Sequence, residues 1–486
     1  MATRSPHPAP LTRATLLRRK PIPTGWKAEA DTGLKRNITT VQLASFGIGS
    51  TIGTGIFFVM AEAVPEAGPS VIISLVFAGI AAGLAALCYA EMASSVPVSG
   101  STYSYAYATL GEFAGMAVAG CLLLEYGVST AAVSVGWSGY LNELLGDLHI
   151  PQIPHALTAA PFDDDPGAIN LPAMILVGMC AILLIRGASE SARANAIMVF
   201  IKIGVLAMFA VIAFTAFNDD NLTPFFADGA HGVTLAAGTI FFSFIGLDTI
   251  STAGEEVKDP QRTMPRALIA ALITVVLVYV LVSLAAVAAQ PSSEFAAQQD
   301  AGLAQILNNV TGATWPSLVL SAGAVISIFS VTLVTLYGQT RILFAMGRDG
   351  MLPAFFTRVN PRTLTPVNNT IVVAVVVAIL AGFIPLDYLA DMVSIGTLVA
   401  FIVVSLGVII LRRREPDLER PFRVPLYPFT PILAIAACGY ILYGLHWYTF
   451  VFFGLWVSAV LVFYLVWGRH HSALNTGDPD PLRAAP

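Results

Sequence analysis

The sequence has little charge and little cysteine. Only 11% of its 486 residues are charged and 56% are hydrophobic, whereas about a quarter of the residues of soluble globular domains are charged. A soluble globular fold is therefore excluded, and the mean hydropathy of +0.75 is that of a polytopic membrane protein. The four cysteines, Cys88, Cys121, Cys180 and Cys438, lie in apolar runs, so we expect no disulfide framework.

The sequence also lacks the marks of an enzyme. The seven histidines lie in the tails or near the ends of apolar runs, and no Cys/His cluster indicates a metal. The sequence shows no recognisable set of a nucleophile, a base and a group that orients the base, which a catalytic site would need. We therefore expect a protein that is not an enzyme, with no metal, no cofactor and no nucleic-acid partner. Residues 1–37 are rich in Pro and Arg and have no signal-peptide core, which predicts a retained cytoplasmic tail.

What the chain has in abundance is long apolar runs, each sufficient to cross a hydrocarbon core of about 30 Å. We predict twelve transmembrane helices. Their ranges are 38–63, 69–95, 112–145, 171–187, 194–217, 233–257, 265–289, 314–346, 367–385, 388–411, 427–445 and 449–467.

Basic residues give the topology independently of hydropathy. Of the 25 Lys and Arg residues, all but Lys202 fall on one side of the membrane when the amino terminus is inside. The opposite loops carry only acids, such as Asp163, Asp219 and Glu294. The positive-inside rule thus predicts that both termini are cytoplasmic. We expect the cell (inner) membrane of a bacterium, because arginine outnumbers lysine and alanine is frequent.

Lys202 stands alone in an apolar helix-length run, with no other charge between Arg193 and Asp219. A buried ammonium is costly in a membrane, so it must be stabilised or lose its proton. It is therefore a candidate for proton coupling, and a structural lysine of fixed charge is the alternative.

The first span contains four glycines in nine positions, Gly47, Gly49, Gly53 and Gly55, among hydroxyl residues. This density predicts an unwound stretch near mid-membrane, with the helix restarting at Thr54. Such backbone is tolerated only where protein or a water-filled cavity surrounds it. The freed amides and carbonyls would suit the two ends of a zwitterion. Close packing is the alternative, and it is the one we expect at Gly79 and Gly83.

A second interruption is predicted in the sixth span, where Asp248 follows Gly246 deep in an apolar run. Matching breaks in the first and sixth spans are the mark of a five-plus-five inverted-repeat transporter fold with the substrate between the halves. The expected parts are a tail at 1–37, a first repeat at 38–217, a second repeat at 218–412, helices 11 and 12 at 413–467, and a cytoplasmic tail at 468–486.

Four segments carry a family resemblance: residues 47–57, 242–248, 251–262 and 337–341. In order and spacing they resemble the amino acid, polyamine and organocation (APC) transporter superfamily, and within it the cationic amino acid transporters and their bacterial permease relatives. The likeness extends from Leu34 to Trp467. It implies an all-helical amino acid permease but does not fix the substrate.

The resemblance also implies the site. The substrate carboxylate would meet Thr54 and Gly55, with Gly53 in the turn. Its amino group would meet carbonyls, and aromatic rings would form a lid and wall, unless they only pack the core. The residues implied are Thr51, Phe242 and Ile245 for the carbonyls, and Phe242 and Phe244 for the rings.

Lys202 matches a fifth-helix lysine that replaces a sodium site in proton-coupled relatives, which implies H⁺ rather than Na⁺ coupling. Glu125, an acid in the third span, is either a contact for a cationic substrate or a scaffold residue. Asp248 is expected to be structural. Glu256, at the cytoplasmic end of the sixth span, belongs either to an inner gate or to a solvated loop.

We expect proton-coupled uptake of an L-amino acid by alternating access. Thr332 and Thr335 on the eighth span leave room for a modest side chain, which favours a small neutral substrate such as alanine, while Glu125 keeps a cationic one open. Amino acid exchange is the second hypothesis, and a transporter-fold sensor or a channel is a third. Beyond substrate, H⁺ and the lipid bilayer, an accessory small membrane subunit stays open.

Overall fold

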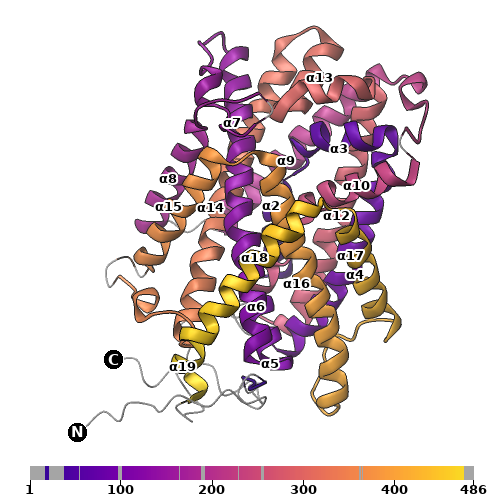
Figure 1. Ribbon diagram of the computed structural model, residues 1–486. Helices are drawn as coiled ribbons and strands as arrows, with labels where there is room; N and C mark the ends of the chain where they lie inside the picture. The colour runs from indigo at the N-terminus through magenta and orange to yellow at the C-terminus, as the bar shows by residue number, and fades with distance from the viewer. Residues whose placement is uncertain are drawn as a thin grey trace.

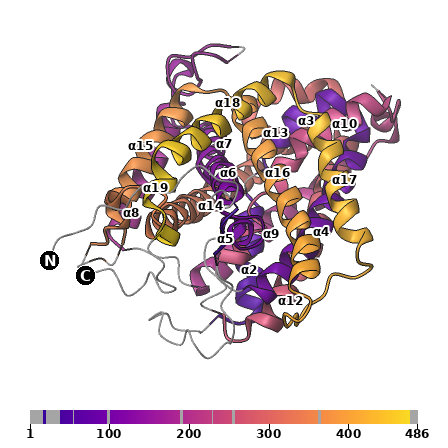
Figure 2. The same cartoon turned by 60° about the horizontal axis from the view of Figure 1, so that its bottom comes forward.

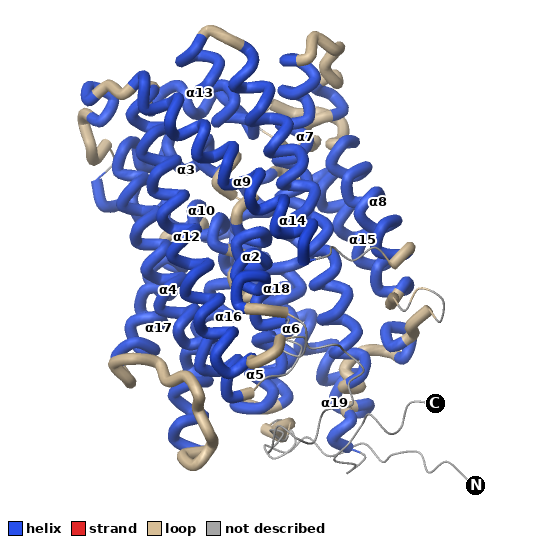
Figure 3. The backbone as a smooth tube through the Cα atoms, turned by 180° about the vertical axis from the view of Figure 1, so that it is seen from behind, coloured by secondary structure: helices blue, strands red, loops and turns tan. Residues whose placement is uncertain are grey.

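The computed structural model describes residues 17–20, 38–53, 55–96, 101–163, 165–187, 192–227, 229–252, 257–360, 363 and 365–475. These residues form helices joined by loops and contain no β-strand (Figure 3). One isolated β-bridge pairs Ile38 with Val257. Most helices run along one common direction, with α5 (Ser101–Thr109) and α19 (Arg469–His471) toward one end of the molecule and α13 (Gly302–Thr311) toward the other (Figure 1).

The described residues between Thr40 and Thr252 form ten α-helices. They are α2 (Thr40–Thr51), α3 (Val59–Ala67), α4 (Val71–Ser95), α5 (Ser101–Thr109), α6 (Glu112–Leu123), α7 (Ser129–Asp147), α8 (Leu171–Ile185), α9 (Ala192–Ala213), α10 (Gly229–Phe241) and α11 (Thr249–Thr252).

The second half continues from α12 to α19. These helices are α12 (Pro260–Ala289), α13 (Gly302–Thr311), α14 (Thr314–Arg348), α15 (Val367–Phe383), α16 (Leu386–Arg414), α17 (Phe429–Tyr443), α18 (Trp447–Phe463) and α19 (Arg469–His471).

Among the described residues, eight helical segments are long and apolar enough to cross a membrane, and three shorter apolar helices are α8, α15 and α17. Helical residues lie in each of the twelve ranges expected from hydropathy. The chain is thus an all-helical, multi-pass membrane protein, while the count of twelve crossings and the inverted repeat stay predictions.

Local signals explain several helix ends. Thr39 and Gln42 form a capping box at the start of α2, which satisfies amides that would otherwise lack a partner. Asn170 caps α8 by accepting a hydrogen bond from the amide of Ala173. At α12, proline occupies the first position, where a missing N–H costs nothing.

The core runs through the middle of the bundle, and the outward faces are apolar. Large exposed hydrophobic side chains lie on α9, α12, α17 and α18, among them Phe200, Leu277, Tyr443 and Leu455. Apolar surface of this extent is not stable in water and fits lipid. All four cysteines are free and buried, as expected.

Candidate functional site

The first span is broken between α2 and α3. Ile52 is extended and Gly53 has φ +117°, a conformation that L side chains rarely adopt. The carbonyl of Gly55 accepts from the amides of Phe58 and Val59. The predicted interruption is therefore present, but Gly47 and Gly49 are still helical and the regular pattern of α3 begins at Val59, not at Thr54.

The sixth span is broken as well. A 3₁₀ turn, η6 (Phe242–Phe244), ends α10, after which Ile245 is extended and Gly246 has φ +95°. The chain resumes in α11 at Thr249. The interruption predicted next to Asp248 is thus present.

The two breaks lie against each other in the core. A Cβ on Gly55 would lie 2.1 Å from Oγ of Ser243, and one on Gly246 would lie 2.7 Å from the carbonyl oxygen of Ser50. Ser50 Oγ also donates to the Gly246 carbonyl at 2.8 Å. Only glycine allows this approach, so the backbones of the two spans lie in direct contact at mid-bundle.

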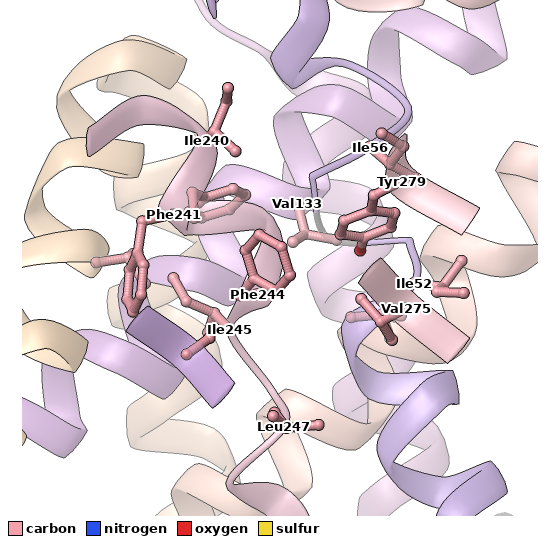
Figure 4. Packing of buried hydrophobic residues seen from close by; sticks show 14 of the residues in the cluster. Ile52, Ile56, Val133, Ile240, Phe241, Phe244, Ile245, Leu247, Val275 and Tyr279 are labelled. Atoms are coloured by element: carbon pink, nitrogen blue, oxygen red, sulfur yellow. The ribbon is translucent and has the colours of Figure 1, made fainter. Parts of the chain in front are cut away.

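Tyr279 of α12 lies between the two breaks. Its hydroxyl is 2.8 Å from the carbonyl oxygen of Thr51 and 2.9 Å from that of Ser243. Its ring packs edge-on against Phe244, with centroids 5.5 Å apart, and Figure 4 shows the Phe244 ring between Ile245 and the Tyr279 ring. A fully buried tyrosine hydroxyl requires such a partner.

Lys202 of α9 reaches the first break. Its side chain is fully buried, and its Nζ donates to the carbonyl oxygen of Gly49 at 2.5 Å. A Cβ on Gly53 would lie 3.6 Å from this Nζ and 3.7 Å from the carbonyl oxygen of Ser327 on α14. The amine therefore lies between α2, the break and α14.

Two further residues that the sequence predicts at the substrate site lie on α14. Thr332 and Thr335 of α14 are buried, but their hydroxyls donate to carbonyls of their own helix, those of Ile328 and Val331. Thr54 and Glu256 lie outside the described residues.

Glu125 lies in a single π-helical turn, η2 (Leu124–Val128), between α6 and α7, and is almost fully buried. Turns of this kind are frequent at functional sites. The Glu125 carboxyl lies near that of the buried Asp248, and Tyr126 donates to Asp248 Oδ2 at 2.8 Å. Ser101 makes a longer contact to the same oxygen at 3.5 Å. Asp248 thus joins the α11 region to the third span and to α5.

A cavity of about 160 Å³ is lined by residues of α3, α10, α16 and α18. Four carboxylates, His446 and Tyr448 line it, the carboxylates being Glu62, Glu66, Asp387 and Asp391. Phe58 also lines the cavity, and its ring packs on that of Phe242 with centroids 5.8 Å apart. The cavity therefore approaches the two breaks from one side, and the rings of Phe58 and Phe242 lie between the cavity and the breaks.

His446 connects two helices at this cavity. It follows α17 and shares a hydrogen bond of 3.0 Å with Asp391 Oδ2 of α16. This bond raises the pKa of His446 above its usual range, helped by the charges of Asp391 and Glu66 and opposed by partial burial.

Sequence reasoning missed Tyr279, Ser243 and the acids of the cavity. A tyrosine in the middle of an apolar run carries a polar tip that needs a partner, and this signal could have marked Tyr279 as a candidate. The acids of the cavity come from ranges far apart in the sequence, so only the fold brings them together.

Comparison with known proteins identifies the chain. A family model described as "Amino acid permease" matches residues 38–468. The chain belongs to the amino acid permease family. Its relatives include cationic amino acid transporters, in agreement with the expected place in the APC superfamily.

Three relatives illustrate the likeness of this permease. The branched-chain amino acid permease BcaP of Bacillus subtilis is 42% identical over 91% of this chain and 95% of its own. The methylthioribose transporter of Bacillus subtilis is 39% identical over 95% and 100%. The vacuolar cationic amino acid transporter 4 of Arabidopsis thaliana is 34% identical over 83% and 68%.

Proposed function

We propose that this permease takes up L-amino acids by proton-coupled alternating access in the cell membrane, with both termini cytoplasmic. The observation that carries the proposal is the contact between two broken spans, with the amine of Lys202 on the carbonyl of Gly49. Breaks of this kind at mid-bundle are where secondary transporters bind substrate and coupling ion. We propose that 38–217 and 218–412 are the two inverted repeats of a twelve-helix fold.

The two breaks offer complementary groups to a zwitterion. The carbonyl oxygens of Thr51, Phe242 and Ile245 suit an α-amino group, and Tyr279 holds the first of them in place. The backbone around Gly53 and Gly55, with the Thr54 hydroxyl, suits the carboxylate. Phe242 and Phe244 would close over the bound substrate, since Phe242 already meets Phe58 at the end of the cavity.

Lys202 is the proposed proton carrier. Its buried ammonium is stabilised by the Gly49 carbonyl, which belongs to the helix that leads into the break. When that helix shifts, the hydrogen bond is lost and the charged form becomes costly in the apolar surroundings. Loss of the proton is thereby linked to movement of the substrate site.

The proposed substrates are neutral amino acids, from alanine to the branched-chain group. Ile245, Phe242 and Phe244 are buried apolar neighbours of the breaks. Two relatives, at 42% and 33% identity, are named as branched-chain amino acid permeases. Glu125 favours a cationic substrate as the second candidate, because its buried carboxyl is adjacent in sequence to Tyr126, which contacts the sixth span.

Uptake by purified protein in liposomes tests the proposal. The panel contains radiolabelled alanine, leucine, valine, arginine and methylthioribose, each with and without an inward proton gradient. We expect the gradient to drive accumulation of alanine, valine or leucine, and Lys202→Ala to abolish accumulation. Lys258→Ala, at an exposed lysine, is the matched control and retains it.

The other hypotheses give different results in the same assay. Exchange without net accumulation, in wild type and under a gradient, would establish an antiporter. Gradient-driven accumulation that survives in Lys202→Ala would refute the role of Lys202. Absence of any uptake or exchange of amino acids would refute the transport proposal and favour a sensor or the transport of methylthioribose.

A further inference from the structure

Residues 17–20, Leu-Arg-Arg-Lys, contact the start of α6, the end of α14 and the residues after α19. Figure 2 turns the end of the bundle that carries α5 and α19 toward the viewer. Arg18 Nη2 is 3.2 Å from Glu112 Oε2, at the start of α6. The Glu112 amide donates to the Arg18 carbonyl at 2.7 Å. Leu17 packs on Gly111, where a Cβ would lie 3.0 Å from the Leu17 backbone.

A second cation of this segment pairs with the opposite half of the chain. Lys20 Nζ is 3.0 Å from Asp349 Oδ1, just after α14. Tyr103 of α5 donates to the other oxygen of Asp349 at 2.9 Å. The segment also reaches the residues after α18, because Arg18 donates to the Asn475 side chain.

The two carboxylates are buried, whereas the two cations are accessible. The Glu112 and Asp349 side chains are 0% and 5% exposed, against 19% for Arg18 and 32% for Lys20. Leaving a buried carboxylate without its cation is strongly unfavourable. Solvent therefore reaches the Arg18–Glu112 and Lys20–Asp349 pairs that hold the segment, and separating either pair costs free energy.

We propose that residues 17–20 are an inhibitory clasp on a docking surface formed by Glu112, Asp349 and Asn475. The clasp joins α6 of the first half of the chain to α14 of the second half and to the segment after α18. It keeps these three segments together at the end that we propose is cytoplasmic, whereas the cavity is lined by α3, α10, α16 and α18. Release of the clasp therefore speeds the step that exposes the substrate site to the cytoplasm; this consequence rests on the proposed transport function.

Docking is tested first, without any transport assay. Trypsin cleaves after Arg18, Arg19 and Lys20, and docking protects these bonds. In the full-length protein in detergent, Glu112→Gln with Asp349→Asn is expected to speed cleavage there at least fivefold. The matched control, Asp417→Asn with Glu419→Gln at exposed acids, leaves the cleavage rate unchanged. Equal cleavage in all three proteins overturns the docking.

The inhibitory role is tested by exchange of amino acid in liposomes at equal pH on both sides. Arg18→Ala with Lys20→Ala is expected to raise the initial exchange rate at least twofold and to speed cleavage after Arg19, the one trypsin site of residues 17–20 that this variant keeps. Arg18→Lys with Lys20→Arg, which retains both charges, stays near wild type. An exchange rate that is unchanged or lower, together with faster cleavage, overturns the inhibitory role.

The two proposals fail in different ways. If the wild type exchanges no amino acid, the transport function is refuted and the trypsin experiment still decides the docking. If the wild type exchanges amino acids and neither variant pair alters cleavage, only the clasp is refuted.

Discussion

The hydroxyl of Tyr279 lies 2.8 Å from the carbonyl oxygen of Thr51, so a side chain of α12 holds the end of α2 where the first span unwinds. The same hydroxyl is 2.9 Å from the Ser243 carbonyl in the second break. One buried group thus sets the relative position of the two breaks.

Removing this hydroxyl while keeping the ring is expected to impair transport. Tyr279→Phe retains the packing on Phe244 but leaves two buried carbonyls without their donor, a loss of about 1–3 kcal/mol. We expect amino acid uptake to fall about fivefold to a hundredfold at limiting substrate, which is that free energy expressed as a rate. Uptake kinetics measure it, and Tyr443→Phe, at a tyrosine 84% exposed, serves as the control. Equal uptake by both variants would show that the two hydrogen bonds of the Tyr279 hydroxyl have no role in transport.

The contact between the breaks predicts which glycines tolerate a methyl group. Gly55→Ala places a Cβ 2.1 Å from Ser243 Oγ and 2.6 Å from its Cα, and overpacking of this kind costs about 1–3 kcal/mol or more. We expect loss of uptake and a lower melting temperature in detergent. Gly439→Ala, where a Cβ meets nothing within 4 Å, is expected to retain both. Full activity of Gly55→Ala would contradict the close approach of the two spans.

The glycine-rich first span shows what the sequence predicts and what it leaves undecided. Glycine density predicted a break, and the positive φ of Gly53 is its centre. Gly47 instead lies inside α2, where a Cβ would meet Ile250 at 2.3 Å. Composition cannot separate a glycine that allows a turn from one that allows close packing, because the neighbour that decides comes from a distant segment.

Single intramembrane charges were easier to interpret than networks. Lys202 was recognised because the free-energy cost of burying its charge follows from the apolar run around it alone. The burial of its side chain agrees with that reasoning. The Tyr279 hydrogen bond depends on α12 meeting α2, and the cluster of cavity acids depends on α3 meeting α16; no local sequence pattern contains either meeting. Hydropathy therefore predicted helices and one polar centre, but not the contacts that organise it.

A buried ion pair joins α4 to α16 and predicts a stability effect. Glu91 accepts from Arg412 Nε at 2.7 Å and from the Val424 amide at 2.7 Å, and its side chain is 1% exposed. Arg412→Ala leaves this carboxylate buried without its main partner, which costs about 3–5 kcal/mol for buried pairs. We expect a clear fall in melting temperature. In a double-mutant cycle, Glu91→Gln with Arg412→Ala should cost less than the sum of the two single changes; additive losses would mean that the pair contributes nothing of its own.

The pair of His446 and Asp391 predicts a pH dependence of stability whose sign follows from the raised pKa of His446. The folded protein binds this proton more tightly than the unfolded chain, so the contribution of the pair is complete below the usual histidine pKa of about 6.5. It is lost as the pH rises through the higher pKa of the folded state. Asp387 and Glu66, which also face His446, act in the same direction. Melting temperatures of wild type and His446→Gln, measured from pH 5 to pH 9, should therefore differ most at acidic pH and converge at alkaline pH. Screening by salt should reduce the difference, since His446 is partly exposed; a difference that grows with pH would contradict the charge pair at the cavity.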